Sequence, residues 1–302
     1  MRDARTMEVG RTRLKHSATA LVAIGFCQLV FTLSSLPVAA QASFRPPSKD
    51  TVGLAWDARG YRFWASVRGV AEEGANTKVR PGTSGIYYLD YKPGQVVGEW
   101  VRWSPPALQD RWRTSRLGSI AWDGDALWVV DETRRVISRV ETDQGLVRTE
   151  IQVPEVVTRP WPTVTGLSWD GKTLWLTSKG GLCACLLRLD PDCGTRGETH
   201  RREKCVLRHI FPRCEPRGLA YQRVEKDGSE YLWTIAYNGP GRAPRLSRRR
   251  IDEKRTTVLT TLEFLWLLPE GEPTAMTFAM DRLWVLDRQA FLVFAVDIEK
   301  AH

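Results

Sequence analysis

The sequence predicts an all-β protein that folds as a single β-propeller of five four-stranded blades, with six blades as the alternative. A two-strand pattern recurs five times and is clearest in residues 166–177, where Asp170-Gly171 separates two apolar runs. Asp-Gly between such runs is a strong hairpin signal. The tryptophans of the second strands recur at intervals of 47 to 64 residues, which is typical of propeller blades. They are Trp64, Trp128, Trp175, Trp233 and Trp284.

A small residue opens each of the five units. The innermost strands of a propeller converge on its axis, where a large side chain would collide with its neighbours. The aromatic residues that follow are expected to fill the wedges between blades, each burying about 150–250 Å². We therefore interpret them as core residues and not as a platform for a ligand. The small residues are Gly53, Ser119, Gly166, Gly218 and Ala275.

Residues 1–42 are predicted to be an export signal outside the fold. A basic beginning is followed by an uncharged, mostly apolar run of 19 residues, Ala18 to Leu36, and Ala40-Gln41-Ala42 fits a small-x-small cleavage site. The expected location is periplasmic or extracellular. Because 19 apolar residues can also span a bilayer, an uncleaved anchor is the alternative, and it is the only membrane contact we expect.

Residues 43–302 are predicted to form the propeller domain, at about 52 residues per unit. The fifth unit is one strand short, and an open edge invites aggregation. We therefore expect the segment near Ser43 to Asp50 to close the ring as a strand, which Pro46-Pro47 keeps short. The outer strands expected in the successive units are residues 85–90 and 96–103, 136–140 and 147–153, 182–189 and 205–211, 245–251 and 257–267, and 291–298.

Five cysteines follow the signal, and all of them lie in the third unit. Opposed residues of an antiparallel hairpin have a constant index sum, and the pairs Cys193–Cys205 and Cys183–Cys214 fit one register to within a residue. These pairs are expected to form disulfides in an oxidising compartment, each contributing about 2–4 kcal/mol. Cys185 is left over, and a thiolate metal site at Cys183-Ala184-Cys185 is the alternative.

The chain carries a formal net charge of +9, of which the signal accounts for +3. The remaining excess is concentrated in the outer hairpins of the third and fourth units and forms a basic rim. Such a rim could bind an anionic surface or an acidic polysaccharide, or it could be a solvated face. Nucleic acid is an improbable partner, since no nucleic-acid-binding module accompanies the charge. The rim residues include Arg196, Arg201, Arg202, Lys204, Arg208, Arg213, Arg242, Arg245, Arg248, Arg249, Arg250, Lys254 and Arg255.

Any ligand site is expected at the axial mouth, where first strands begin and second strands end. The catalytic candidates there are Asp131, Glu132 and Asp287, because converging carboxylates raise one another's pKa, as a general acid or base requires. The competing interpretation is that the aspartates accept hydrogen bonds in turns and pair with arginines. The expected ligand-binding residues are Thr165, Lys179, Arg217, Asn238 and Arg288.

The repeated Gly-Leu-Ala-Trp-Asp followed by Leu-Trp-Val resembles the blades of the gluconolactonase and senescence-marker family and of NHL-type propellers. In the lactonases, carboxylate and amide side chains placed just before first-strand glycines hold a divalent metal. The matching positions here are Val52, Thr165 and Arg217, which cannot form that cage. We predict no metal or cofactor, with a divalent cation bound elsewhere as an open alternative. The five-bladed, exported glutaminyl cyclotransferases are similar in architecture only.

The chain after the signal has three histidines, of which two fall in the outer hairpin of the third unit and one is the C-terminal residue. A histidine base at the axis is therefore not expected, and serine-hydrolase, zinc-protease and phosphate-loop motifs are absent. The favoured function is an exported binding or scaffold module. The alternative is a lactonase-type or glutaminyl-cyclotransferase-type enzyme with a carboxylate centre, and a quinone-dependent electron-transfer propeller ranks last.

Overall fold

The structure is a computed structural model, and it describes residues 42–69, 83–92, 98–153, 163–179, 184–194, 206–211, 215–237, 244–251, 256–263, 271–296 and 298. Contacts divide the chain into Met1–Ala39 and Ala40–His302, and every described residue belongs to the second unit. Among the described residues, no helix has both the length and the apolar character needed to span a membrane.

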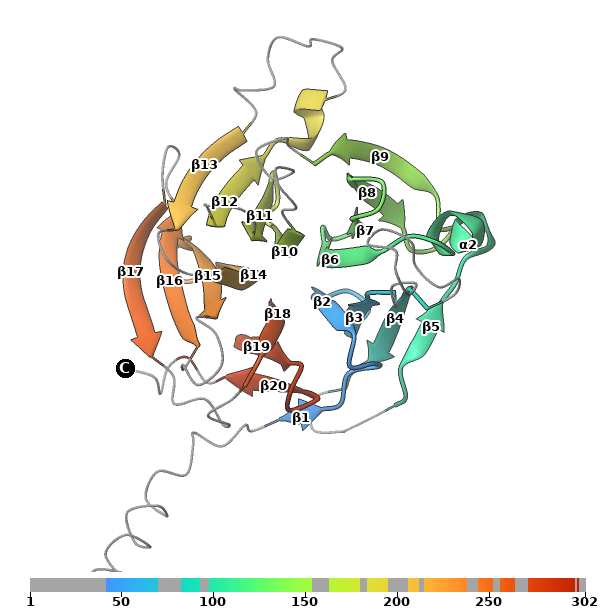
Figure 1. The fold of residues 1–302 in the computed structure, drawn as a ribbon. Coiled ribbons are helices and arrows are strands. Elements are labelled where there is room, and N and C mark those ends of the chain that lie inside the picture. The colour runs from blue at the N-terminus through green and yellow to red at the C-terminus, as the bar shows by residue number, and fades with distance from the viewer. Residues whose placement is uncertain are drawn as a thin grey trace, which may run out of the picture. The chain divides into compact units, whose positions relative to one another are not determined.

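Five four-stranded antiparallel sheets surround one axis, so the prediction of a five-bladed propeller is confirmed (Figure 1). We number them blades 1 to 5 in chain order. Blade 1 has β2 (Thr51–Asp57), β3 (Arg62–Val67), β4 (Gly85–Asp90) and β5 (Val101–Trp103), and blade 2 has β6 (Leu117–Trp122), β7 (Ala126–Asp131), β8 (Val136–Glu141) and β9 (Val147–Gln152). Blade 3 has β10 (Thr163–Trp169), β11 (Leu174–Lys179), β12 (Ala184–Leu189) and β13 (Val206–Phe211), with the 3₁₀ helix η1 (Pro191–Gly194) between the last two. Blade 4 has β14 (Glu215–Arg223), β15 (Glu230–Tyr237), β16 (Arg245–Ile251) and β17 (Thr256–Glu263), and blade 5 has β18 (Pro273–Ala279), β19 (Arg282–Asp287) and β20 (Leu292–Val296).

The missing strand of blade 5 comes from the other end of the domain. The two-residue strand β1 (Ser43–Phe44) pairs with β20 and closes the ring, as predicted. The Phe44 ring lies 5.1 Å from the Phe63 ring and 5.6 Å from the Trp284 ring, and so contacts blades 1 and 5 together. Ring closure therefore combines a short hydrogen-bonded strand with the packing of the Phe44 ring, which we call the aromatic plug, between blades 1 and 5.

The register shifts near the start of all five first strands, just before the small residue in blades 1, 3, 4 and 5 and across Gly118 and Ser119 in blade 2. These shifts are β-bulges, which re-aim side chains, and the sequence pattern did not predict them. The steric reason for the small residue holds at Gly166, where an added Cβ would lie 2.8 Å from the backbone nitrogen of Leu219 in blade 4. The first strands are thus in backbone contact near the axis.

Aromatic stacking joins neighbouring blades. The Trp64 ring of blade 1 stacks on Trp122 of blade 2 with centroids 6.4 Å apart, and the Trp128 ring of blade 2 stacks on Trp169 of blade 3 at 6.0 Å. The five second-strand tryptophans are each at most 2% exposed. They belong to the hydrophobic core, as expected.

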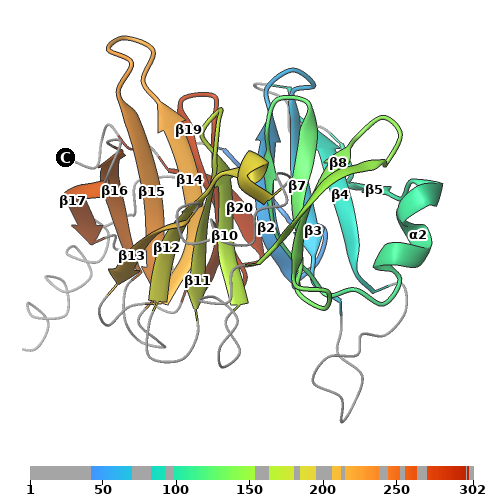
Figure 2. The ribbon, with the colours of Figure 1, turned by 90° about the horizontal axis from the view of Figure 1, so that it is seen from above.

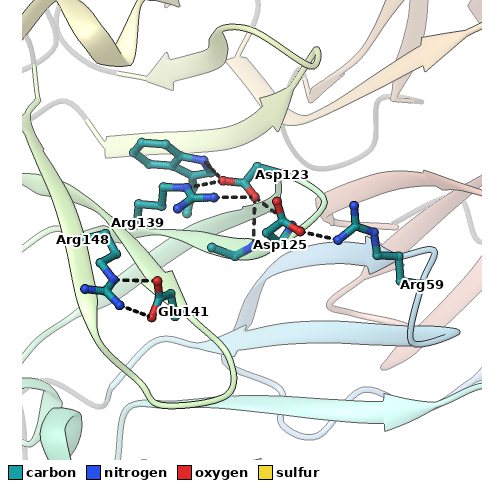
Figure 3. Close-up of polar contacts among 8 residues, drawn as sticks. Arg59, Asp123, Asp125, Arg139, Glu141 and Arg148 are labelled. Carbon is teal, nitrogen blue, oxygen red and sulfur yellow. Dashed lines mark hydrogen bonds and ion pairs between the residues drawn. The ribbon is translucent and has the colours of Figure 1, made fainter.

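The aspartate that directly follows the first strand of blades 2 and 3 anchors the tryptophan of the second strand. Asp123 Oδ2 accepts a hydrogen bond from the indole N–H of Trp128 at 2.9 Å, while Arg139 of the third strand donates to the same oxygen at 2.6 Å (Figure 3). Asp170 repeats the arrangement with the Trp175 N–H at 2.7 Å, and Arg188 lies 3.8 Å away. Some arginines of the outer strands are therefore occupied within the blades.

One helix was not predicted. The helix α2 (Pro106–Trp112) follows β5 and lies at the periphery of the ring (Figures 1 and 2). Proline at its first position suits helix entry, because its missing N–H would be unpaired there anyway. Leu108 and Trp112, four residues apart on one face, are buried against the core between blades 1 and 2.

Candidate functional site at the axial mouth

The axial mouth is the end of the propeller where first strands begin and second strands end. In blades 1, 2 and 5, the residue after the second strand donates its backbone N–H to the carbonyl of the residue before the first strand. The N···O distances are 2.9, 2.9 and 2.8 Å. The three donor–acceptor pairs are Arg68 with Asp50, Glu132 with Arg116, and Arg288 with Glu272.

The side chains of each pair carry opposite charges. Arg116 and Glu132 form an ion pair of 3.0 Å within blade 2, and Arg288 and Glu272 approach to 3.9 Å within blade 5. Since the backbone bond holds each pair at the rim of the mouth, charge is placed there in a fixed pattern.

Further ion pairs join the blades. Arg68 of blade 1 contacts Glu132 of blade 2 at 2.6 Å, and Arg288 of blade 5 contacts Asp50 of blade 1 at 3.6 Å. Arg217, on the bulge of β14, contacts Glu272 of blade 5 at 3.6 Å. We call this alternating series the charge ladder. Its members, in order across blades 4, 5, 1 and 2, are Arg217, Glu272, Arg288, Asp50, Arg68, Glu132 and Arg116.

The ladder has four arginines and three carboxylates. Burial lowers the pKa of Arg68 from its ordinary value, and the nearby charges of Arg116 and Arg288 lower it further, while Glu132 opposes the shift. Burial likewise raises the pKa of Glu132, while Arg68 and Arg116 oppose that shift. Arg68 therefore lies within electrostatic reach of two like charges, those of Arg116 and Arg288.

Asp131 and Asp287 occupy equivalent positions and build the same turn. Asp131 Oδ1 accepts the backbone N–H of Arg134 at 3.0 Å, and Asp287 Oδ1 accepts that of Ala290 at 2.9 Å. Each turn ends in a residue with positive φ, Arg135 or Phe291. The second carboxylate oxygen of Asp131 also accepts from the Ser115 hydroxyl at 2.7 Å. These contacts are the turn hydrogen bonds of the competing interpretation.

The other predicted residues are distributed as follows. Thr165 lies on the bulge of β10, with its hydroxyl 3.2 Å from that of Thr177, and Lys179 ends β11. The guanidinium of Arg217 also lies 5.2 Å from the centre of the Tyr237 ring.

Asn238 lies outside the described residues, as do Cys183, Cys205 and Cys214 and the side chain of Cys193, so the disulfide prediction lies outside them too. Cys185 is buried in the core shared by blades 2 and 3.

Four ladder residues are not among the candidate site residues predicted from the sequence: Arg68, which follows a second strand, and Asp50, Arg116 and Glu272, which precede first strands. A sequence signal exists for the last three, because each has the opposite charge to the residue that follows the second strand of its blade. Within the described ranges, no three His, Cys, Asp or Glu side chains gather as a metal site would require.

A comparison with protein-family models gives no match, and neither does a comparison with curated proteins. Similar solved structures include a nidogen/laminin complex, with 14% identity over 83% of this chain and 77% of that chain and a TM-score of 0.45. The glutaminyl cyclase of Myxococcus xanthus has 13% identity over 85% of this chain and 94% of that chain, with a TM-score of 0.48. The PQQ-bound aldose sugar dehydrogenase of Streptomyces coelicolor has 16% identity over 83% of this chain and 81% of that chain, with a TM-score of 0.43. At these identities the likeness concerns the fold alone, and that fold is the β-propeller.

Proposed function

We propose that this protein is an exported β-propeller that binds an anionic ligand or surface at its axial mouth, as a binding or scaffold module. The observation that carries the proposal is the group of arginines in the charge ladder, with Arg116 and Arg288 on either side of Arg68 in the series. Arg116 and Arg288 both lie within electrostatic reach of Arg68, so an anion that binds among them relieves the repulsion that they exert on it.

The exposure of the ladder supports the same function. The side chains of Arg288 and Arg116 are 48% and 36% exposed, so their guanidiniums are accessible to a ligand. Carboxylate, phosphate and sulfate groups accept the paired N–H bonds that guanidiniums donate. Exposed ion pairs contribute little to stability, about 0–1 kcal/mol each, so an incoming anion can replace them at small cost.

Export rests on the sequence of residues 1–42, with its basic beginning, apolar run and small-x-small site. The test is to express the full chain in bacteria, separate the cell fractions and weigh the protein. A mass that lacks the first 42 residues, in the periplasm or medium, supports export and cleavage. Retention in the cytoplasm at full mass argues against both.

Binding is tested by titrating the protein with polygalacturonate and with inorganic phosphate by isothermal calorimetry at several salt concentrations. Arg288→Gln is expected to weaken binding by about 5-fold or more and to reduce its salt dependence. Arg59→Gln is the control, since Arg59 is exposed in the hairpin between β2 and β3, at the opposite end of the propeller from the mouth. Equal binding by both variants would refute a site at the mouth.

The alternative function, an enzyme with a carboxylate centre, is supported by Glu132 alone, since burial raises its pKa toward the range that a general acid uses. It is tested with a panel of lactones and peptides with N-terminal glutamine, on wild type, Glu132→Gln and Asp287→Asn. Turnover that disappears in Glu132→Gln and persists in Asp287→Asn would establish this function in place of binding alone.

A further inference from the structure

A pocket of about 500 Å³ lies at the outer edge of the ring, and none of its described lining residues belongs to the charge ladder. It is formed by the helix α2, the end of β5 and the start of β4 (Figure 2 shows these elements). Its volume falls in the range of small-molecule sites. The lining residues include Arg102, Trp103, Gln109, Asp110, Trp112 and Arg113.

The indole of Trp112 has an unused hydrogen-bond donor. Trp112 is only 7% exposed and lines the pocket, yet its N–H donates no hydrogen bond within the described part of the chain, and it is not sealed from solvent. A buried indole N–H ordinarily finds a partner. Trp103, by contrast, donates its N–H to the carbonyl of Thr142 at 3.2 Å. The Trp112 donor is therefore available to a molecule in the pocket.

The charged groups of the helix complete the site. Asp110 lies in the last turn of α2 and Arg113 directly follows the helix; both are exposed, and neither forms an ion pair with a described residue. Asp110 offers two acceptor oxygens and Arg113 a planar set of donors. Arg102 donates to the carbonyl of Ser84 at 2.9 Å, which holds its guanidinium against the pocket wall. The charged lining residues are therefore two guanidiniums and one carboxylate, and a hydroxyl-rich ligand can accept hydrogen bonds from the former and donate to the latter.

We propose that this pocket binds a unit of a neutral saccharide. Vicinal hydroxyls both donate and accept, so one pair can bridge the Asp110 carboxylate and the Arg113 guanidinium, while a third oxygen accepts the Trp112 N–H. The carbon face of a sugar ring suits the apolar surface supplied by Trp103, Pro105 and Leu108. None of the described lining residues of this pocket belongs to the charge ladder, so the proposal does not rest on anion binding at the axial mouth.

The test is calorimetric and tryptophan-fluorescence titration with three probes: maltotriose, cellotriose and tri-N-acetylchitotriose. At least one is expected to bind with a Kd of about 1 mM or tighter. Trp112→Phe keeps an aromatic ring and removes the N–H, and is expected to weaken binding at least about 5-fold. Asp110→Asn and Arg113→Gln are expected to weaken it similarly without lowering the melting temperature, because both side chains are exposed and unpaired.

Glu225→Gln, in the exposed hairpin between β14 and β15, is the matched control and should bind like wild type. Arg288→Gln should also bind the trisaccharides normally, which separates this site from the proposed anion site. The proposal is overturned if none of the three probes shows binding at a probe concentration of about 10 mM, which is 10-fold above the expected Kd. It is equally overturned if Asp110→Asn and Arg113→Gln, correctly folded, bind a probe as tightly as wild type.

Discussion

Asp170→Ala tests whether the turn aspartates act as anchors for the core tryptophans. The carboxylate of Asp170 is 6% exposed and accepts four hydrogen bonds, from the backbone of Lys172 and Thr173, the Thr173 hydroxyl and the Trp175 indole. Its loss leaves the N–H of Trp175, a residue 1% exposed, without a partner.

The magnitude follows from these contacts. An unsatisfied buried donor costs about 1–3 kcal/mol, and the loss of the turn bonds adds about 1 kcal/mol. The free energy of unfolding should therefore fall by about 2–4 kcal/mol. At about 2–4 °C per kcal/mol for a domain near this size, the melting temperature should fall by about 4–16 °C.

Blade 1 provides the matched control. Among the described residues, Asp57 accepts only the backbone N–H groups of Arg59 and Gly60, both at 2.9 Å, and the buried N–H of Trp64 has no partner. Asp57→Ala should therefore cost about 0.5–1.5 kcal/mol. Both variants are measured by urea unfolding followed by tryptophan fluorescence and by thermal unfolding followed by circular dichroism. Equal losses of stability would refute the anchoring role of the aspartate.

Three further predictions concern the axis, the ring closure and pH. Gly166→Ala should cost about 1–3 kcal/mol in thermal unfolding and more than Gly218→Ala, because the added Cβ would approach backbone to 2.8 Å in the first and 3.2 Å in the second; the opposite order would contradict the packing argument. Phe44→Ala should lower stability by about 2–4 kcal/mol and promote association through the β20 edge, as seen by size-exclusion chromatography, and a fully stable monomer would argue against closure by β1. The raised pKa of Glu132 means that its stabilising contribution is complete below the ordinary glutamate pKa and is lost as pH rises, so Glu132→Gln should be less destabilising in urea unfolding at pH 7 than at pH 4. The reverse order would show that Arg68 and Arg116 outweigh burial.

The fold was predictable because its signals are local and repeated. Asp170-Gly171 sets a hairpin, Trp175 marks the strand that follows, and a small residue such as Gly166 marks the axis, whichever blade is considered. Ring closure by β1 followed from counting strands. The helix α2 was missed because it occurs once, so no repeat exposed it, and its seven residues carry only two buried side chains.

The site was less predictable because it depends on which blades are neighbours. The position of Glu132 at the mouth follows from its own blade, but its shortest ion pair is with Arg68, 64 positions earlier in the chain. The bulges that bring Arg217 toward blade 5 are not visible in a strand pattern. Asp131 and Asp287 were identified as mouth residues, and the structure adds the turn hydrogen bonds that occupy them.

The charge ladder joins the ends of the ring as well as offering a site. Its inter-blade ion pairs join blades 4 and 5, 5 and 1, and 1 and 2, and so lie on both sides of the joint that β1 closes. The exposed ion pairs of Arg288, at 3.6 and 3.9 Å, contribute little to stability. The 2.6 Å pair of Arg68 with Glu132 is less exposed and is expected to contribute more. A ligand that competes for Arg288 would therefore leave the Arg68–Glu132 contact and the aromatic plug of Phe44 in place. Anion binding would use Arg288, whereas the contact between blades 1 and 2 uses Arg68 and Glu132. Because these are different members of the ladder, anion binding at the mouth is compatible with a closed ring.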